Sequence, residues 1–323
     1  MSADVTAARR IVLPALAALA AALGLCAGPA AAQLIAPTSP TDPSPYVDWP
    51  ALLPALPAPA KDPTERDCIE GADSCIDRTI EEMKHRLHTV VPVCDHRAVF
   101  SVAYLRVTED VRDAARAGVF SDARWLQNED RVFARLYFDA YDDYQARRLH
   151  RLPAAWRMTF DATRHRRMGA LGNFLMSMNA HINRDFPYVL DGVGIRRPDG
   201  TSRKPDHDAY NRRLAALYEP VLREIAERFD PTTDDADIAI LDNEGAFAVL
   251  QSWREGVWRN AERLTNARTR AARRRVAASI EAYSATVARV LLRTFRYRDG
   301  GARRAARDAW CAQHGGQDPG RAP

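Results

Sequence analysis

Apolar residues recur at intervals of three and four along most of the chain after residue 75, the spacing of one face of an α-helix. The segment TIEEMKHRLHTVV, for example, places Ile80, Met83 and Leu87 on one side. No segment of useful length alternates between apolar and polar residues, as a half-buried strand would. The pattern predicts an all-α fold, a single multi-helix domain resembling a bundle.

Start and stop signals divide this pattern into separate helices. One helix is expected to begin with Asp95 as its N-cap and to end at Gly118, and the next to begin with Ser121 or Asp122 as its cap. Later helices are expected over residues 168–190, over 206–229 with a bend at Pro220, over 242–264, and from there to about residue 296.

The first 32 residues have the pattern of a bacterial secretory signal peptide. Two arginines precede the apolar segment IVLPALAALAAALGLCAG, and three alanines supply an A-x-A cleavage site, with Sec and twin-arginine export both open. Nine prolines between residues 33 and 63 exclude a helix there. The expected organisation is a signal peptide over 1–32, a proline-rich arm or linker over 33–63, an all-helical domain over 64–313 and a disordered tail over 314–323.

Four cysteines remain after the predicted cleavage, and an even number in an exported chain predicts two disulfides. The short gap between Cys68 and Cys75 contains a glycine and favours a local loop. Cys94 would then bond to Cys311 and clamp the early helices to the C-terminus. A zinc site made of all four is the alternative, although no C-x-x-C spacing supports it. We expect a secreted, periplasmic or envelope protein whose mature chain has no transmembrane span.

Composition adds little about partners. The chain of 323 residues has 46 Lys and Arg against 42 Asp and Glu, a net charge of +4 that requires no anionic partner. Arginine greatly outnumbers lysine and alanine is abundant, as in GC-rich coding. No nucleic-acid partner is therefore expected, and the sequence indicates no other particular partner.

Four hydrogen-bonding side chains interrupt the apolar run FLMSMNAHINRDFPYVL. On a wheel at about 100° per residue, His181 and Asp185 lie at one edge of the apolar face, and Asn179 and Asn183 at the other. Buried polar groups need partners. The carboxylate could orient the imidazole as a base, or both could bind one metal. Alternatively, all four tie this helix to its neighbours.

A metal site would need at least one further ligand from another helix. His207 is the residue that we group with His181 and Asp185 as a metal set, and a divalent metal is one option for an otherwise unknown cofactor. None of the candidates has a diagnostic spacing to His181. The residues that could supply the further ligand are Asp95, His96, Asp206, His207 and Asp208, of which the aspartates also suit helix capping.

The segment SWREGVWRNAERL places Arg254, Trp258 and Glu262 one above the other on a helix. Arginine there could hold a carboxylate or phosphate beside the indole, so these three are the predicted substrate-binding residues. The alternative is an ordinary ion pair over a packed tryptophan. The overlapping basic segment 259–275 could meet an anionic surface, but its arginines are spread around the helix as on a solvated face.

The stretch NAHINRDFP (179–187), preceded by LGNFLMSM, resembles the signature of a bacterial, largely actinobacterial, family of uncharacterised helical proteins, a domain of unknown function. In that family the stretch usually reads G-M-N-A-H-I-N-x-D-L-P, so Ser177 and Phe186 depart from it. CDHRAVFSVAYLRVTE, RVFARLYF, DAYN and WREGVWRNAERL resemble further family blocks. The resemblance implies a helical fold, over about 64–295, centred on the Asn/His/Asn/Asp cluster, and no established activity.

Two functions remain open, because no G-x-S-x-G, P-loop, H-E-x-x-H or G-x-G-x-x-G motif is present. One is a hydrolase in which His181 acts as general base or metal ligand and Asp185 orients it, while Asn179 and Asn183 hold substrate or an oxyanion. The other is a non-catalytic secreted or envelope binding protein in which the cluster is structural. A pocket at His181 favours the first, and a sealed, fully bonded cluster the second.

Overall fold

The computed structural model describes residues 73–233, 243–299 and 301–316. Within these ranges the chain forms helices and no strand, which confirms the all-α prediction. The predicted signal peptide, the proline-rich arm and most of the predicted tail lie outside the described residues. None of the described helices is long and apolar enough to cross a membrane.

Ten α-helices and three short helical segments follow one another along the described chain. The α-helices are α4 (Asp73–Val90), α5 (Ala98–Arg116), α6 (Ala123–Gln145), α7 (Ala154–Arg164), α8 (Ala170–Met178), α9 (Phe186–Val193), α10 (Lys204–Arg228), α11 (Asn243–Thr265), α12 (Arg270–Phe295) and α13 (Ala302–His314). The short segments are the 3-10 turns η1 (Leu149–Arg151) and η3 (Pro231–Thr233) and the π-helical segment η2 (Asn179–Asp185).

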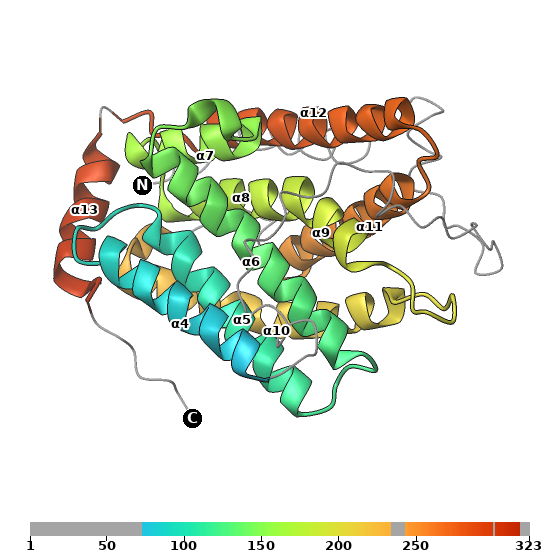
Figure 1. The fold of residues 1–323 in the computed structure, drawn as a ribbon. Coiled ribbons are helices and arrows are strands. Elements are labelled where there is room, and N and C mark those ends of the chain that lie inside the picture. Colours follow the sequence, from blue (N-terminus) through green and yellow to red (C-terminus); the bar gives the residue numbers. More distant parts are fainter. Residues whose placement is uncertain (1–72, 234–242, 300, 317–323) are drawn as a thin grey trace.

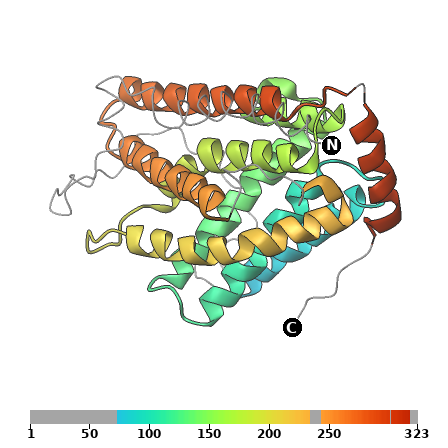
Figure 2. The same ribbon diagram turned by 180° about the vertical axis from the view of Figure 1, so that it is seen from behind.

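Helices α8 and α9, joined by η2, pass through the middle of the bundle. They lie between α12 and α10 in Figure 1, and Figure 2 shows the same order from behind, with α10 and α11 in the foreground. Helices α6, α7, α11 and α12 all contact η2. A segment surrounded in this way must be apolar on nearly every side, which explains the composition of FLMSMNAHINRDFPYVL.

The single helix predicted over 168–190 is wrong, because η2 winds as a π-helix between α8 and α9. Pro187 stands in the first turn of α9. Proline has no N–H, and its ring would clash with the carbonyl four residues earlier, here that of Asn183, in a regular α-helix. The wider turn of η2 precedes this proline and relieves that clash. A wheel at about 100° per residue therefore does not describe these seven side chains.

The predicted caps are partly confirmed. Asp122 caps α6, and its carboxylate accepts the N–H of Trp125 at 3.1 Å. Asp95 does not cap α5, which begins at Ala98 after Arg97. The Asp95 carboxylate instead accepts the backbone N–H and the guanidinium of Arg97. The Asp95 carboxylate is thus paired with Arg97 and does not act as the expected N-cap of α5.

The side chain of Asp206, near the start of α10, holds the start of a different helix. Its buried carboxylate accepts the backbone N–H groups of Ser121 and Asp122, at 2.8 and 3.0 Å. A negative charge there also suits the positive end of the α6 dipole. Asp206 thus lies in the first turn of α10, as predicted, but its carboxylate bonds to the start of α6 instead of capping its own helix. Pro220 lies inside α10, and the helix continues past it to Arg228.

The disulfide between Cys94 and Cys311 joins residues 217 positions apart and confirms the predicted clamp. It fastens α13 to the loop before α5. The buried Arg307 strengthens this junction, donating to His96 at 3.0 Å and to Asn173 at 2.7 Å. Cys75 is also disulfide-bonded, and its predicted partner, the other cysteine of CIEGADSC, lies outside the described residues.

Candidate functional site

The two asparagines of η2 make bonds inside the protein. Asn179 is completely buried, and its Nδ2 donates to the carbonyl oxygen of Ser284 on α12 at 2.9 Å. Asn183 Nδ2 donates in turn to Asn179 Oδ1 at 3.1 Å. Asn179 therefore ties η2 to α12, and Asn183 supports Asn179 from within η2. Their amide donors are used there, which leaves the predicted role of holding a substrate or an oxyanion without support.

Asp185 is the anchor between η2 and α7. Its Oδ2 accepts Trp156 Nε1 at 2.7 Å, and its Oδ1 accepts Arg184 Nη1 at 2.9 Å. Arg184 also bonds Glu281 on α12 at 2.7 Å. His181 Nδ1 lies 3.5 Å from Asp185 Oδ2, too far for a good hydrogen bond to an oxygen that already has a close donor. The carboxylate is thus engaged by the indole and the guanidinium rather than by the imidazole.

His181 faces the other way, into aromatic surroundings. Its ring stacks on Phe133 with centroids 3.5 Å apart and the planes inclined by 4°, and it meets the ring of Tyr104 at 4.5 Å. Among the described residues, neither ring nitrogen has a hydrogen-bond partner. Burial lowers the pKa of His181, although the nearby Asp185 opposes this. The imidazole is therefore neutral at neutral pH, with two unused nitrogens.

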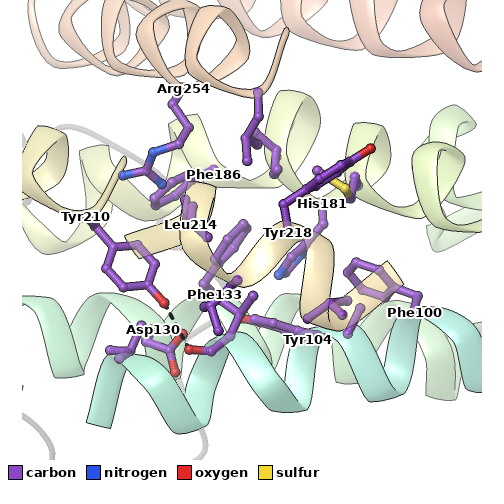
Figure 3. Close-up of a pocket in the computed structure, with 18 of the residues that line it drawn as sticks. Phe100, Tyr104, Asp130, Phe133, His181, Phe186, Tyr210, Leu214, Tyr218 and Arg254 are labelled. Carbon is purple, nitrogen blue, oxygen red and sulfur yellow. Dashed lines mark hydrogen bonds between the residues drawn. The ribbon is translucent and has the colours of Figure 1, made fainter. Parts of the chain in front are cut away.

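A cavity of about 110 Å³ opens beside His181, between η2 and helices α5, α6, α10 and α11. Its walls are mainly aromatic and aliphatic, with Tyr104, Asp130, His181 and Arg254 directed toward it in Figure 3. It is far larger than one water molecule needs and somewhat smaller than the apolar cavity of about 150 Å³ known to hold benzene. The residues that line it are Phe100, Ala103, Tyr104, Val107, Val111, Leu126, Glu129, Asp130, Phe133, Phe174, Met178, His181, Ile182, Phe186, Tyr210, Leu214, Leu217, Tyr218, Val221, Leu250 and Arg254.

Two neighbouring carboxyl groups from α6 share this cavity wall. Burial raises the pKa of Glu129 to about 8, with Arg254 acting in the opposite direction, and it raises the pKa of Asp130 to about 7. Among the described residues, Glu129 Oε2, Asp130 Oδ2 and the hydroxyl of Tyr104 have no hydrogen-bond partner. Near neutral pH, Glu129 is mostly protonated, so it can donate a hydrogen bond where an ionised carboxylate could only accept.

Glu129 and Asp130 were not predicted as site residues, although the sequence carries a signal for Glu129. It stands four residues after Trp125 and four before Phe133, in the middle of an apolar stripe that continues to Tyr137. A carboxylate at such a position is the same anomaly that singled out η2. The polar triplet NED (128–130) resembles a solvent-facing turn unless the positions of its residues around the helix are taken into account.

The structure brings Arg254 to the same cavity as His181. Its Nε donates to Asn211 Oδ1 and its Nη2 to the carbonyl oxygen of His207, both at 2.6 Å. Trp258 and Glu262, predicted with it, lie outside the cavity lining and bond to each other at 3.0 Å. Only the arginine of the predicted substrate-binding set reaches this site.

The predicted metal ligands do not converge. His207 Nε2 lies 3.3 Å from the carbonyl oxygen of Arg254, and burial followed by the charge of Arg254 lowers the pKa of His207 well below its usual value. Both oxygens of Asp185 accept hydrogen bonds from protein donors. Among the described residues, no group of three His, Cys, Asp or Glu side chains could hold a metal ion. We assign no metal role to this set.

Comparison with known proteins gives a family without an activity. No curated protein and no solved structure matches the chain. One family model matches residues 76–294, a stretch that contains η2 and every residue lining the cavity. Its description is "Family of unknown function (DUF5995)". The chain therefore belongs to this family of unknown function.

Proposed function

We propose that the chain binds a small, mainly apolar molecule in the cavity beside His181. The observation that supports this most strongly is that His181, Glu129, Asp130 and Tyr104 all line one cavity with unpartnered polar atoms. A buried polar atom without a partner costs about 1–3 kcal/mol of stability. A ligand that forms hydrogen bonds with these atoms removes that cost, and the aromatic walls bind its apolar part.

The charge state of the cavity indicates the class of ligand. Glu129, with a pKa of about 8, is a donor at neutral pH, while the neutral imidazole of His181 offers one donor and one acceptor. Arg254 already donates to two protein oxygens. The best complement is an uncharged molecule of about benzene size or smaller that carries an alcohol, amide or carbonyl group.

A matched pair of ligands tests this proposal. We expect cyclopentanol to bind about tenfold or more tightly than cyclopentane in a calorimetric or NMR titration, because only the alcohol can bond to the buried polar atoms. His181→Phe should remove much of this preference while cyclopentane still binds. Tyr144→Phe is the control, since that hydroxyl bonds to Asp161 at 3.0 Å and does not line the cavity. Equal affinities for the two ligands, or binding of neither, would contradict the proposal.

A second candidate is an enzyme that uses the same cavity, for example a hydrolase of small esters or amides. A neutral imidazole and a protonated carboxyl group that line the same cavity provide a base and an acid at one pH. His181 would remove a proton and Glu129 would supply one. Small p-nitrophenyl esters are suitable probes. Turnover that disappears in both His181→Phe and Glu129→Gln, and that declines above about pH 8, would support this function over simple binding.

We also propose that the chain is exported. The buried Cys94–Cys311 disulfide suits an oxidising compartment, and the first 32 residues have the pattern of a cleaved signal. Expression of the full chain in a bacterium, followed by N-terminal sequencing of the exported fraction, tests this. We expect the mature protein to begin at Gln33. Retention of the whole chain in the cytoplasm with reduced cysteines would contradict it.

A further inference from the structure

A second concave surface lies where the end of α7, the end of α12 and the start of α13 meet, at the upper left of Figure 1. It has a volume of about 570 Å³, and we call it the basic groove. None of its lining residues is acidic, although Asp and Glu are common in the chain as a whole. Its basic residues are His165, Arg166, Arg167, Arg296, Arg298 and Arg304.

Backbone contacts hold the walls of the basic groove together. The N–H of Tyr297 donates to the carbonyl oxygen of Arg167 at 2.9 Å, and Met168 pairs with Arg296 in an antiparallel bridge. Arg166 has a φ of +50°, in the left-handed region that non-glycine residues rarely adopt. Segments more than a hundred positions apart in the sequence thus meet in a fixed arrangement with their arginines on one surface.

Most of the arginines in the groove lack an acidic partner. Arg166 pairs with Asp308 at 2.7 Å, and Arg298 donates to the carbonyl oxygen of Arg293. Among the described residues, no carboxylate lies within ion-pair distance of Arg167, Arg296 or Arg304. Like charges gathered in a concave site repel one another and attract a counter-ion. The groove therefore suits an anion, and the part of the chain that the structure describes supplies none for Arg167, Arg296 or Arg304.

We propose that the basic groove binds a molecule with more than one phosphate group. Guanidinium groups match phosphate oxygens in paired hydrogen bonds, and several arginines from three segments of the chain suit several phosphates better than one. The net charge of +4 does not reveal this site, because acidic residues elsewhere in the chain offset these arginines in the sum. The basic segment 259–275, which drew attention in the sequence, lies toward the opposite end of α12 and does not line the groove.

Titration of the full chain with inorganic tripolyphosphate tests the proposal. We expect saturable binding that weakens with salt, and a loss of about tenfold or more in Arg296→Gln/Arg304→Gln, because charge-assisted bonds are lost. Arg274→Gln/Arg275→Gln is the matched control, since it removes the same charge from exposed positions of α12 outside the groove. No saturable binding, or equal losses in the two variants, would overturn the proposal.

Vesicles distinguish a soluble phosphate ligand from a lipid headgroup. The chain is mixed with vesicles of phosphatidylcholine that contain cardiolipin, a lipid with two phosphate groups, and with vesicles of phosphatidylcholine alone. Binding to the anionic vesicles that is lost in the groove variant and retained in the control variant would identify a lipid phosphate. Tripolyphosphate binding without vesicle binding would identify a soluble one. Circular dichroism confirms that both variants are folded, and absence of both kinds of binding would overturn the inference.

Discussion

Buried polar groups lie on both sides of η2, but the two sides differ in whether these groups have hydrogen-bond partners. On one side, Asn179, Asn183 and Asp185 each bond to protein partners on α12, η2 or α7. On the other, His181 and Glu129 face a cavity with polar atoms that have no partner among the described residues. Burial alone therefore does not mark a functional residue. The proposed binding site rests instead on polar atoms that lack an internal partner beside a cavity.

The same contrast sharpens the two functions that the sequence left open. A fully bonded network describes the asparagines and Asp185, whereas a pocket with free hydrogen-bonding atoms describes His181. A π-helical segment is a frequent feature of functional sites, because its wide turn moves side chains out of the regular helical register. Here it directs Asp185 toward α7 while the imidazole packs against Phe133 in the cavity wall.

The largest expected loss of stability comes from breaking the hydrogen bonds of Asp185, on the side of η2 where the polar groups have partners. Asp185→Ala removes the acceptor of Trp156 Nε1 and one of the two carboxylates that bond Arg184. Breaking such a buried charge pair costs about 3–5 kcal/mol, measured as the free energy of unfolding in urea. Asp185→Asn, which keeps an acceptor oxygen, should lose less. A loss below about 1 kcal/mol for the alanine variant would show that this network is not structural.

A smaller effect is expected on the pH dependence of stability, which the Glu129 carboxyl group beside the cavity should control. The pKa of Glu129 is about 8 in the folded chain and ordinarily 4.5, so its contribution to stability is greatest below pH 4.5 and decreases as pH rises toward 8. Between pH 6.5 and 8, the titration of His181 affects the wild type and Glu129→Gln alike, so it cancels in the difference between them. Over that window the wild type should lose about 2 kcal/mol more than Glu129→Gln. Parallel stability curves for the two proteins would contradict a buried, protonated Glu129.

The smallest effect compares two tyrosine hydroxyls. Tyr144→Phe deletes a hydroxyl that donates to Asp161, and we expect a loss of about 1 kcal/mol. Tyr104→Phe deletes a hydroxyl without a partner, so stability should be unchanged or slightly higher. Thermal unfolding of the two variants side by side measures the difference. A larger loss for Tyr104→Phe would mean that its hydroxyl is bonded after all.

Much of the fold could be predicted from the sequence, because it depends on short-range patterns. The three-and-four spacing of apolar residues gave the helices, and cysteine spacing led to the bond between Cys94 and Cys311. The π-helical turn could not be predicted by a wheel, which assumes a constant angle. It depends on how Pro187 is accommodated after a buried segment.

The candidate site was predicted less completely, for a physical reason. His181 and Arg254 were found because each is a polar residue on an apolar helix face. Glu129 has the same signal, but its acidic neighbours suggest a solvated surface. Whether a buried group has a hydrogen-bond partner depends on helices far away in the sequence. Asp185 accepts a bond from Trp156 on α7, whereas His181 has no partner among the described residues.

An NMR titration of the carboxyl groups of Glu129 and Asp130, with and without cyclopentanol, tests the central claim most directly. Because burial beside the cavity raises both pKa values, Glu129 should titrate near 8 and Asp130 near 7, and both should respond to the alcohol. Titration near the ordinary values of 4.5 and 3.8, with no response to the alcohol, would contradict a desolvated ligand site beside His181.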